Sequence, residues 1–152
     1  MTHIEELYNI LQMESDLTEE LCSVLATKQR AIVRFQGAVL AEATASEENL
    51  LAPLEKLEAE RLQCSAAICE RLSSGAVKAG DAPKLGDVIA LMGPDDATRI
   101  APQAERLRKA VDVILRLNGQ NKTLLEHSMQ FVKETFRIIT DDHTKQLIDQ
   151  RI

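Results

Sequence analysis

Apolar residues recur at steps of three and four along most of this chain, and that spacing is typical of amphipathic helices. Residues 3–36 contain neither proline nor glycine, so the pattern there predicts a first long helix. Thr2 followed by Glu5 is typical of a capping box, in which each side chain serves the other residue's backbone amide. Gly37 accepts the left-handed conformation in which many helices end, so we expect the chain to reverse there.

The same spacing continues over residues 38–73 and predicts a second long helix. Pro53 lies inside this segment, where it either kinks one continuous helix or begins a new one. A kink is the favoured interpretation, because the apolar spacing continues through the proline. We expect this helix to end at residues 73–75, because glycine and proline become frequent over residues 73–99. Within that connection only residues 85–92 are apolar enough for a short helix.

Residues 100–139 resume the apolar spacing and predict a third long helix, with Pro102 in its first turn. Residues 140–152 are more polar and are expected to fray as a tail. Together the elements predict an all-α fold, an elongated antiparallel bundle or coiled coil of three long helices with a short helical connection before the third. At this length residues 1–152 are interpreted as a single domain.

Composition supports helices and narrows the classes of partner. Aromatic residues make up only 3% of the chain, so the core must be aliphatic, which favours helices over a β-sandwich. The formal net charge of −6 argues against nucleic-acid binding and against a polybasic membrane-surface protein. No apolar run approaches the ~20 residues of a membrane-spanning helix, and the acidic N-terminus argues against a secretory signal. We therefore expect a cytoplasmic protein without membrane insertion.

The sequence shows no pattern typical of a catalytic or metal site. Neither H-E-x-x-H nor paired E-x-x-H is present, and the glycines do not form a phosphate-binding loop. The three cysteines and three histidines lack the spacing of metal ligands, so the cysteines are interpreted as small packing residues. The pattern predicts no enzyme, no cofactor and no metal, and an enzymatic or metal-binding bundle is the least favoured alternative.

A polar interruption marks the middle of the third helix. Asn118 and Asn121 are three residues apart, which places them on one helix face, and that face is the apolar one. Asparagine is a poor helix former, and Gly119 costs a further ~1 kcal/mol relative to alanine, so this stretch needs an explanation. A buried asparagine can fix which helices pair, and a polar stretch can also face a groove or a partner. The two interpretations are compatible.

After this interruption, apolar residues cover more of the helix than one stripe requires. They are Leu124, Leu125, Met129, Phe131, Val132, Phe136, Ile138 and Ile139. Methionine and phenylalanine suit adaptable contacts between a helix and a groove. We expect one side of this segment to pack on the first two helices and the other side to remain for a partner.

With these features the chain resembles the FlgN-type flagellar export chaperones, which are short, acidic helical proteins of the cytoplasm. The resemblance covers nearly the whole chain: a leading helix, a leucine-spaced second helix, a variable connection rich in glycine and proline, and a third helix. The most family-like segment is Leu117-Asn118-x-x-Asn121-x-x-Leu124-Leu125-x-x-Ser128. Pro53, Gly119 and the cysteines depart from the family pattern.

This resemblance implies a function that the residues do not show by themselves. It implies binding of the C-terminal segments of hook–filament junction proteins, protection of these proteins from early assembly, and their delivery to the type III export gate. The family's substrate-binding region is its C-terminal part, which corresponds here to Asn118, Asn121, Leu124, Leu125, Ser128, Met129, Phe131, Val132 and Phe136. The alternative function is a helical coiled-coil adaptor or structural protein that acts as a homodimer through its long helices.

Overall fold

The computed structural model describes residues 2–73 and 83–151. Within these ranges the chain forms no strand and four helices: α1 (His3–Val33), α2 (Gly37–Leu72), α3 (Leu85–Ala90) and α4 (Pro94–Arg151). The prediction of an all-α fold, with three long helices and a short one before the third, is confirmed. In the described ranges no helix combines the length and the apolarity that crossing a membrane demands.

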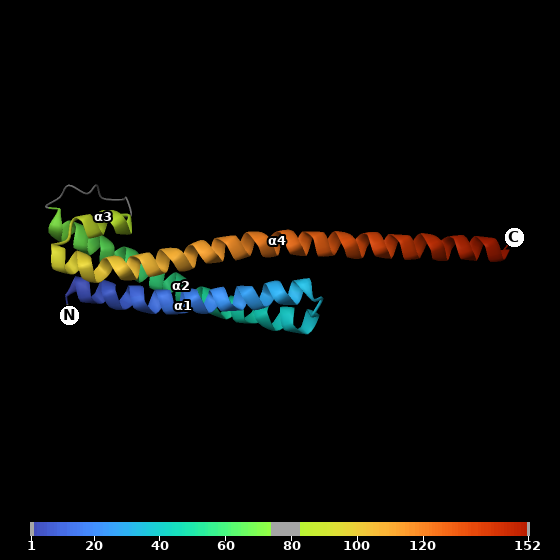
Figure 1. Ribbon diagram of the computed structural model, residues 1–152, viewed down its shortest axis with the longest axis horizontal. Helices are drawn as coiled ribbons and strands as arrows, with labels where there is room; N and C mark the ends of the chain where they lie inside the picture. The colour runs from blue at the N-terminus through green and yellow to red at the C-terminus, as the bar shows by residue number, and fades with distance from the viewer. Residues whose placement is uncertain (1, 74–82, 152) are drawn as a thin grey trace.

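The long helices form an elongated up-down-up bundle in which α1 packs against both α2 and α4 (Figure 1). α2 runs antiparallel to α1, and α4 runs parallel to α1. The short helix α3 packs on α2 and α4 at the end of the bundle where α1 begins. α4 continues beyond the turn between α1 and α2 as a single helix, so one end of the molecule is only one helix thick.

Ion pairs join α1 to both of its neighbours and help to set the helix register. Arg61 of α2 donates from Nε to Glu14 Oε2 at 2.8 Å, and both side chains are largely buried. Burial raises the pKa of the Glu14 carboxyl, although the positive charge of Arg61 acts in the opposite direction. On the other side of α1, Arg106 of α4 donates to Asp16 Oδ1 and to Glu19 Oε2, each at 2.7 Å.

Two apolar clusters form the core. The larger lies at the end that carries α3 and contains Leu7, Ile10, Leu11, Leu57, Cys64, Ile68, Cys69, Val88, Met92, Ile100 and Leu107. The smaller lies further along the bundle and is made of Leu21, Leu25 and Leu117. Between the two, α1 buries the polar residues Glu14, Ser15 and Thr18. The apolar positions of all three long helices therefore meet at α1 and leave the distant end of α4 without a core.

The turn between α1 and α2 differs from the prediction. The left-handed residue is Phe35, with φ of 54°, and Gly37 is instead the first residue of α2. The Gln36 amide donates to Ala31 O at 2.9 Å and the Phe35 amide donates to Ile32 O at 3.3 Å, which is the bonding pattern of a Schellman motif. Sequence preference pointed to glycine, but this motif places an aromatic residue in the strained position.

α2 is one continuous helix through Pro53, which confirms that no new helix begins there, while the favoured kink stays a prediction. The proline removes the hydrogen bond to the Asn49 carbonyl, and both residues are exposed, so water can replace that bond. α2 ends at Leu72 with Ser73 as its C-cap. The remainder of the predicted helix end and its connection, residues 74–82, lies outside the described residues.

α4 is longer than predicted at both ends. It begins at Pro94 rather than at residue 100, with Asp95 and Asp96 in the first turn, where acidic side chains stabilise the positive end of the helix dipole. Pro102 therefore lies inside the helix and not in its first turn. The helix also continues to Arg151, through the segment that we expected to be a frayed polar tail. That segment contains no glycine or proline to stop it.

Candidate functional site

α4 leaves the bundle near its midpoint. Its last core residue is Leu117, which packs with two leucines of α1. One turn further on, Asn121 donates from Nδ2 to Leu25 O of α1 at 3.1 Å, and Gln29 donates to Gln120 at 2.9 Å. We call residues 94–121 the proximal segment of α4 and residues 122–151 the distal segment, which continues past the α1–α2 turn (Figure 1).

The distal segment exposes a broad apolar face. Large apolar side chains there are 46–71% exposed: Met129, Phe131, Val132, Phe136, Ile138, Ile139 and Leu147, which we call the distal face. At 100° per residue, these positions span roughly half of the helix circumference. No other element covers them within the described ranges. Contiguous exposed apolar surface of this kind usually marks a site of interaction with another molecule.

The other side of the distal segment is polar and charged. It carries Glu126, Gln130, Lys133, Glu134, Arg137 and Asp141. Two hydrogen bonds on this side stay within the helix: Thr123 Oγ1 donates to Gly119 O at 3.1 Å, and Gln130 Nε2 donates to Glu134 Oε1 at 3.4 Å. The segment is thus an amphipathic helix whose polar side suits water and whose apolar side suits a second helix or a groove.

The structure brings together most of the residues predicted to bind a partner. Leu124, Leu125 and Ser128 are half-buried at the start of the distal segment. Met129, Phe131, Val132 and Phe136 follow as part of the distal face, with Phe136 the most exposed at 71%. Their role in binding stays a prediction, but they share one helix and lie within a few turns of each other.

The two asparagines share a helix face but not an environment, because α1 covers Asn121 and does not cover Asn118. Asn118 is exposed, whereas Asn121 is 3% exposed and hydrogen-bonded to α1. Among the described residues, Oδ1 of Asn121 has no hydrogen-bond partner. The geometry of Asn121 fits the interpretation of a buried asparagine that fixes helix pairing.

Three residues of the distal face were missing from the predicted site: Ile138, Ile139 and Leu147. Ile138 and Ile139 were already among the excess apolar residues noted in the sequence, and Leu125, Val132 and Ile139 recur every seven residues, but the predicted site ended at Phe136. The expected helix end near residue 139 explains why Leu147, which lies beyond it, was missed. Sequence reasoning also missed a cluster of His3, Glu6 and Cys64, because its members lie far apart in the chain.

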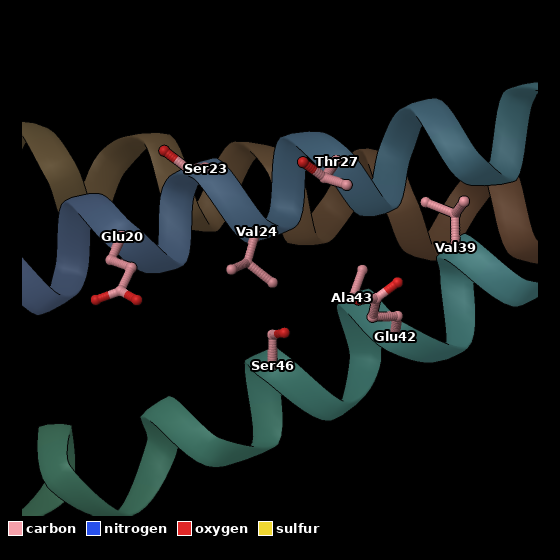
Figure 2. Close-up of a pocket in the computed structure, with 8 residues that line it drawn as sticks. All are labelled: Glu20, Ser23, Val24, Thr27, Val39, Glu42, Ala43 and Ser46. Carbon is pink, nitrogen blue, oxygen red and sulfur yellow. The ribbon is translucent and has the colours of Figure 1, made fainter.

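Besides the distal face, a pocket of about 390 Å³ lies between α1 and α2 towards their turn (Figure 2). Its lining residues are Glu20, Ser23, Val24, Thr27, Val39, Glu42, Ala43 and Ser46. These residues offer two carboxylates and three hydroxyls but neither a basic residue nor a nucleophile–base pair. The distal face is therefore the stronger candidate for function.

A bundle from which an uncovered amphipathic helix extends is suited to binding another protein. A family model, FlgN protein, matches residues 1–148 of this chain. The chain therefore belongs to the FlgN family, a family of flagellar export chaperones. Searches of curated proteins and of solved structures gave no match.

Proposed function

We propose that this protein is a cytoplasmic export chaperone that binds the C-terminal segments of hook–filament junction proteins, prevents their premature assembly and delivers them to the export gate. Family membership supports the flagellar class of client. The observation that carries the proposed site is the distal face, seven large apolar side chains on a helix that extends past its own bundle.

The mechanism follows from the shape of this helix. A subunit segment that assembles through an apolar face would self-associate in the cytoplasm unless that face were covered. An amphipathic client helix laid along the distal face buries both apolar sides at once. Each large side chain that becomes buried contributes roughly 1–3 kcal/mol, so a few of them suffice for specific binding.

Release of the client requires that its affinity for the distal face remain moderate. Ser128 and Thr135 lie along the middle of the apolar side of the distal segment, between Phe131 and Val132 when viewed down the helix. Their hydroxyls lose contact with water when a client covers them, which opposes binding. In this proposal Asn121 sets the register of α4 on α1, and the predicted contacts that reach the client are Leu124, Leu125, Ser128 and the distal face.

The direct test is calorimetric titration of the full chain with C-terminal segments of the hook–filament junction proteins from its own organism. We expect saturable one-to-one binding, and no binding of matched N-terminal segments of the same junction proteins. Failure of every junction-protein segment to bind would overturn the proposal.

A homodimeric adaptor is the second candidate, because an uncovered apolar helix face also suits a second copy of the chain. Sedimentation over a range of protein concentrations separates the two. A chaperone with a free distal face is a monomer at the concentrations at which it binds a client. A stable dimer that loses its interface on Phe131→Asp substitution would favour the adaptor.

A further inference from the structure

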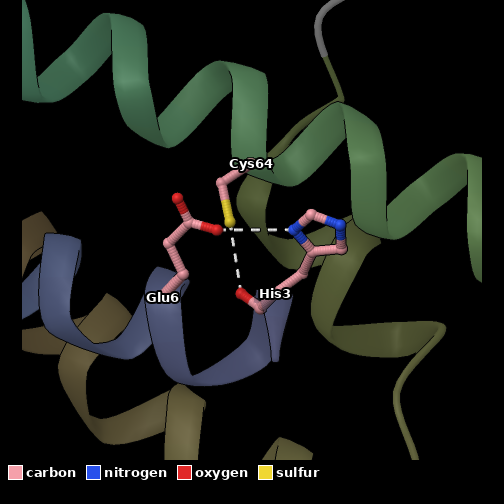
Figure 3. A group of neighbouring side chains, drawn as sticks. All are labelled: His3, Glu6 and Cys64. Atoms are coloured by element: carbon pink, nitrogen blue, oxygen red, sulfur yellow. Dashed lines mark hydrogen bonds and ion pairs between the residues drawn. The ribbon is translucent and has the colours of Figure 1, made fainter. Parts of the chain in front are cut away.

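His3, Glu6 and Cys64 form a compact cluster where the first turn of α1 meets α2 (Figure 3). His3 Nδ1 lies 3.4 Å from Glu6 Oε2, and Cys64 Sγ lies 3.2 Å from His3 O, to which it donates. One ligand atom from each of the three side chains lies within 4.8 Å of the others. An imidazole nitrogen, a carboxylate oxygen and a sulfur thus converge from two helices.

The cluster is accessible and yet well anchored. The side chains of His3 and Glu6 are 47% and 53% exposed, and all three residues line a groove of about 600 Å³ between α1 and α2. Cys64 belongs to the larger core cluster, so its backbone is held in place. An ion could enter from water through the groove and meet one fixed ligand and two adjustable ones.

We propose that His3 Nδ1, the Glu6 carboxylate and Cys64 Sγ bind a divalent cation of the zinc class, with water as a fourth ligand. Nitrogen, oxygen and sulfur together are the ligand set that tetrahedral Zn²⁺ accepts. Zinc bond lengths of about 2.0–2.3 Å place tetrahedral ligand atoms roughly 3.3–3.6 Å apart. The nitrogen–oxygen distance already matches this spacing, and small rotations of two exposed side chains bring both atoms closer to the sulfur.

Binding exchanges a proton for the metal at the sulfur. Burial raises the pKa of the Cys64 thiol to about 11, so without metal the thiol is protonated and donates to His3 O. On binding, the S–H bond breaks, an S–metal bond forms, and the proton leaves to solvent. His3 binds as neutral imidazole and Glu6 as carboxylate, so the two negative ligands balance the charge of the cation.

The consequence is a crosslink between α1 and α2 at the end of the bundle opposite the distal segment. A ligand that binds only the folded state stabilises it by RT ln(1 + c/Kd), where c is the free ligand concentration, so the stabilisation grows with the logarithm of that concentration above the dissociation constant. Zinc should therefore raise the melting temperature without changing the distal face, so the site is independent of the proposed client binding.

The experiment is a titration of the reduced full chain with Co²⁺ as a spectroscopic probe, followed by displacement with Zn²⁺. We expect one equivalent of Co²⁺ to bind with a thiolate-to-cobalt charge-transfer band, and Zn²⁺ to remove that band and to raise the melting temperature by several degrees. Cys64→Ala should abolish the band, and His3→Ala should weaken binding at least tenfold.

Three substitutions serve as matched controls: Cys22→Ala, Cys69→Ala and His127→Ala should leave the band and the affinity unchanged. His3→Ala and Glu6→Ala test the proposal even if Cys64→Ala fails to fold, since both residues are exposed and the capping box uses Thr2 and Glu5. The absence of a thiolate band in the unsubstituted protein would overturn the proposal. So would a band that survives loss of His3 and Glu6, or one that requires Cys22 or Cys69.

Discussion

The proximal and distal segments of α4 belong to one uninterrupted helix and carry a similar apolar spacing, yet their surroundings are opposite. Ile100 in the proximal segment is fully buried, whereas Ile138 in the distal segment is 61% exposed. An apolar helix side indicates that another surface covers it but does not identify that surface. In the proximal segment the cover is α1 together with α3, and in the distal segment we propose that it is another protein.

Length explains why the two segments differ. α1 has 31 residues and α4 has 58, which correspond to about 47 Å and about 87 Å at 1.5 Å per residue. The hairpin of α1 and α2 therefore ends while α4 continues. Because the distal segment makes no core, the binding that we propose for its apolar side chains and the stability of the fold can be changed separately.

The largest expected contrast comes from one substitution made in both segments. Ile100→Ala should lower the free energy of unfolding by about 3 kcal/mol, because it leaves a cavity in the core. Ile138→Ala should lower it by less than about 0.5 kcal/mol, since its side chain is mostly exposed. Urea unfolding of both variants measures the difference, and equal losses would show that the distal segment is packed in solution.

The asparagine pair compares a position that α1 covers with one that it leaves exposed, both in the last turns of the proximal segment. Asn121→Ala should destabilise the protein by about 1 kcal/mol, because it removes the buried hydrogen bond to Leu25 O. Asn118→Ala should be neutral or slightly stabilising, since Asn118 is exposed and alanine is the better helix former. Thermal or urea unfolding distinguishes them, and an inverted order would place Asn118 in the interface with α1.

A smaller effect is expected at Gly119, just before α4 leaves the bundle. A methyl group added there meets no atom within 4 Å beyond its neighbours and the backbone of its own helix, so Gly119→Ala should stabilise the helix by roughly 0.5–1 kcal/mol. The measurement is the shift of the urea midpoint at unchanged slope. A loss of stability instead would indicate that the glycine position is packed or bent in solution.

The fold was largely predictable from the chain because helix spacing and breaking residues are local signals. Three-residue and four-residue steps predicted the long helices, and the apolar run at residues 85–92 predicted α3 close to its observed place at Leu85–Ala90. One error arose where a local preference was overruled, and the other where a polar composition was taken for the end of a helix. Phe35 takes the left-handed position that glycine usually fills, and α4 continues through residues 140–151 because no breaker stops it.

The candidate site was only partly predictable. The sequence shows that the region after Asn121 has more apolar surface than one stripe, but it does not show where the hairpin ends. That end decides which side chains of the distal segment are exposed. The meeting of His3 and Cys64 depends on the packing of α1 against α2, which no spacing within either helix reveals.

The central claim is that the distal face binds the client, and one calorimetric comparison tests it most directly. Phe131→Asp places a charge on the distal face, and Gln130→Asp places the same charge on the opposite side of the same turn. Loss of a large apolar contact should weaken binding of a junction-protein C-terminal segment roughly 30-fold, about 2 kcal/mol, at an unchanged melting temperature. Gln130→Asp should change the affinity less than about twofold. Equal affinities for the two variants would contradict the claim and place the client elsewhere on the molecule.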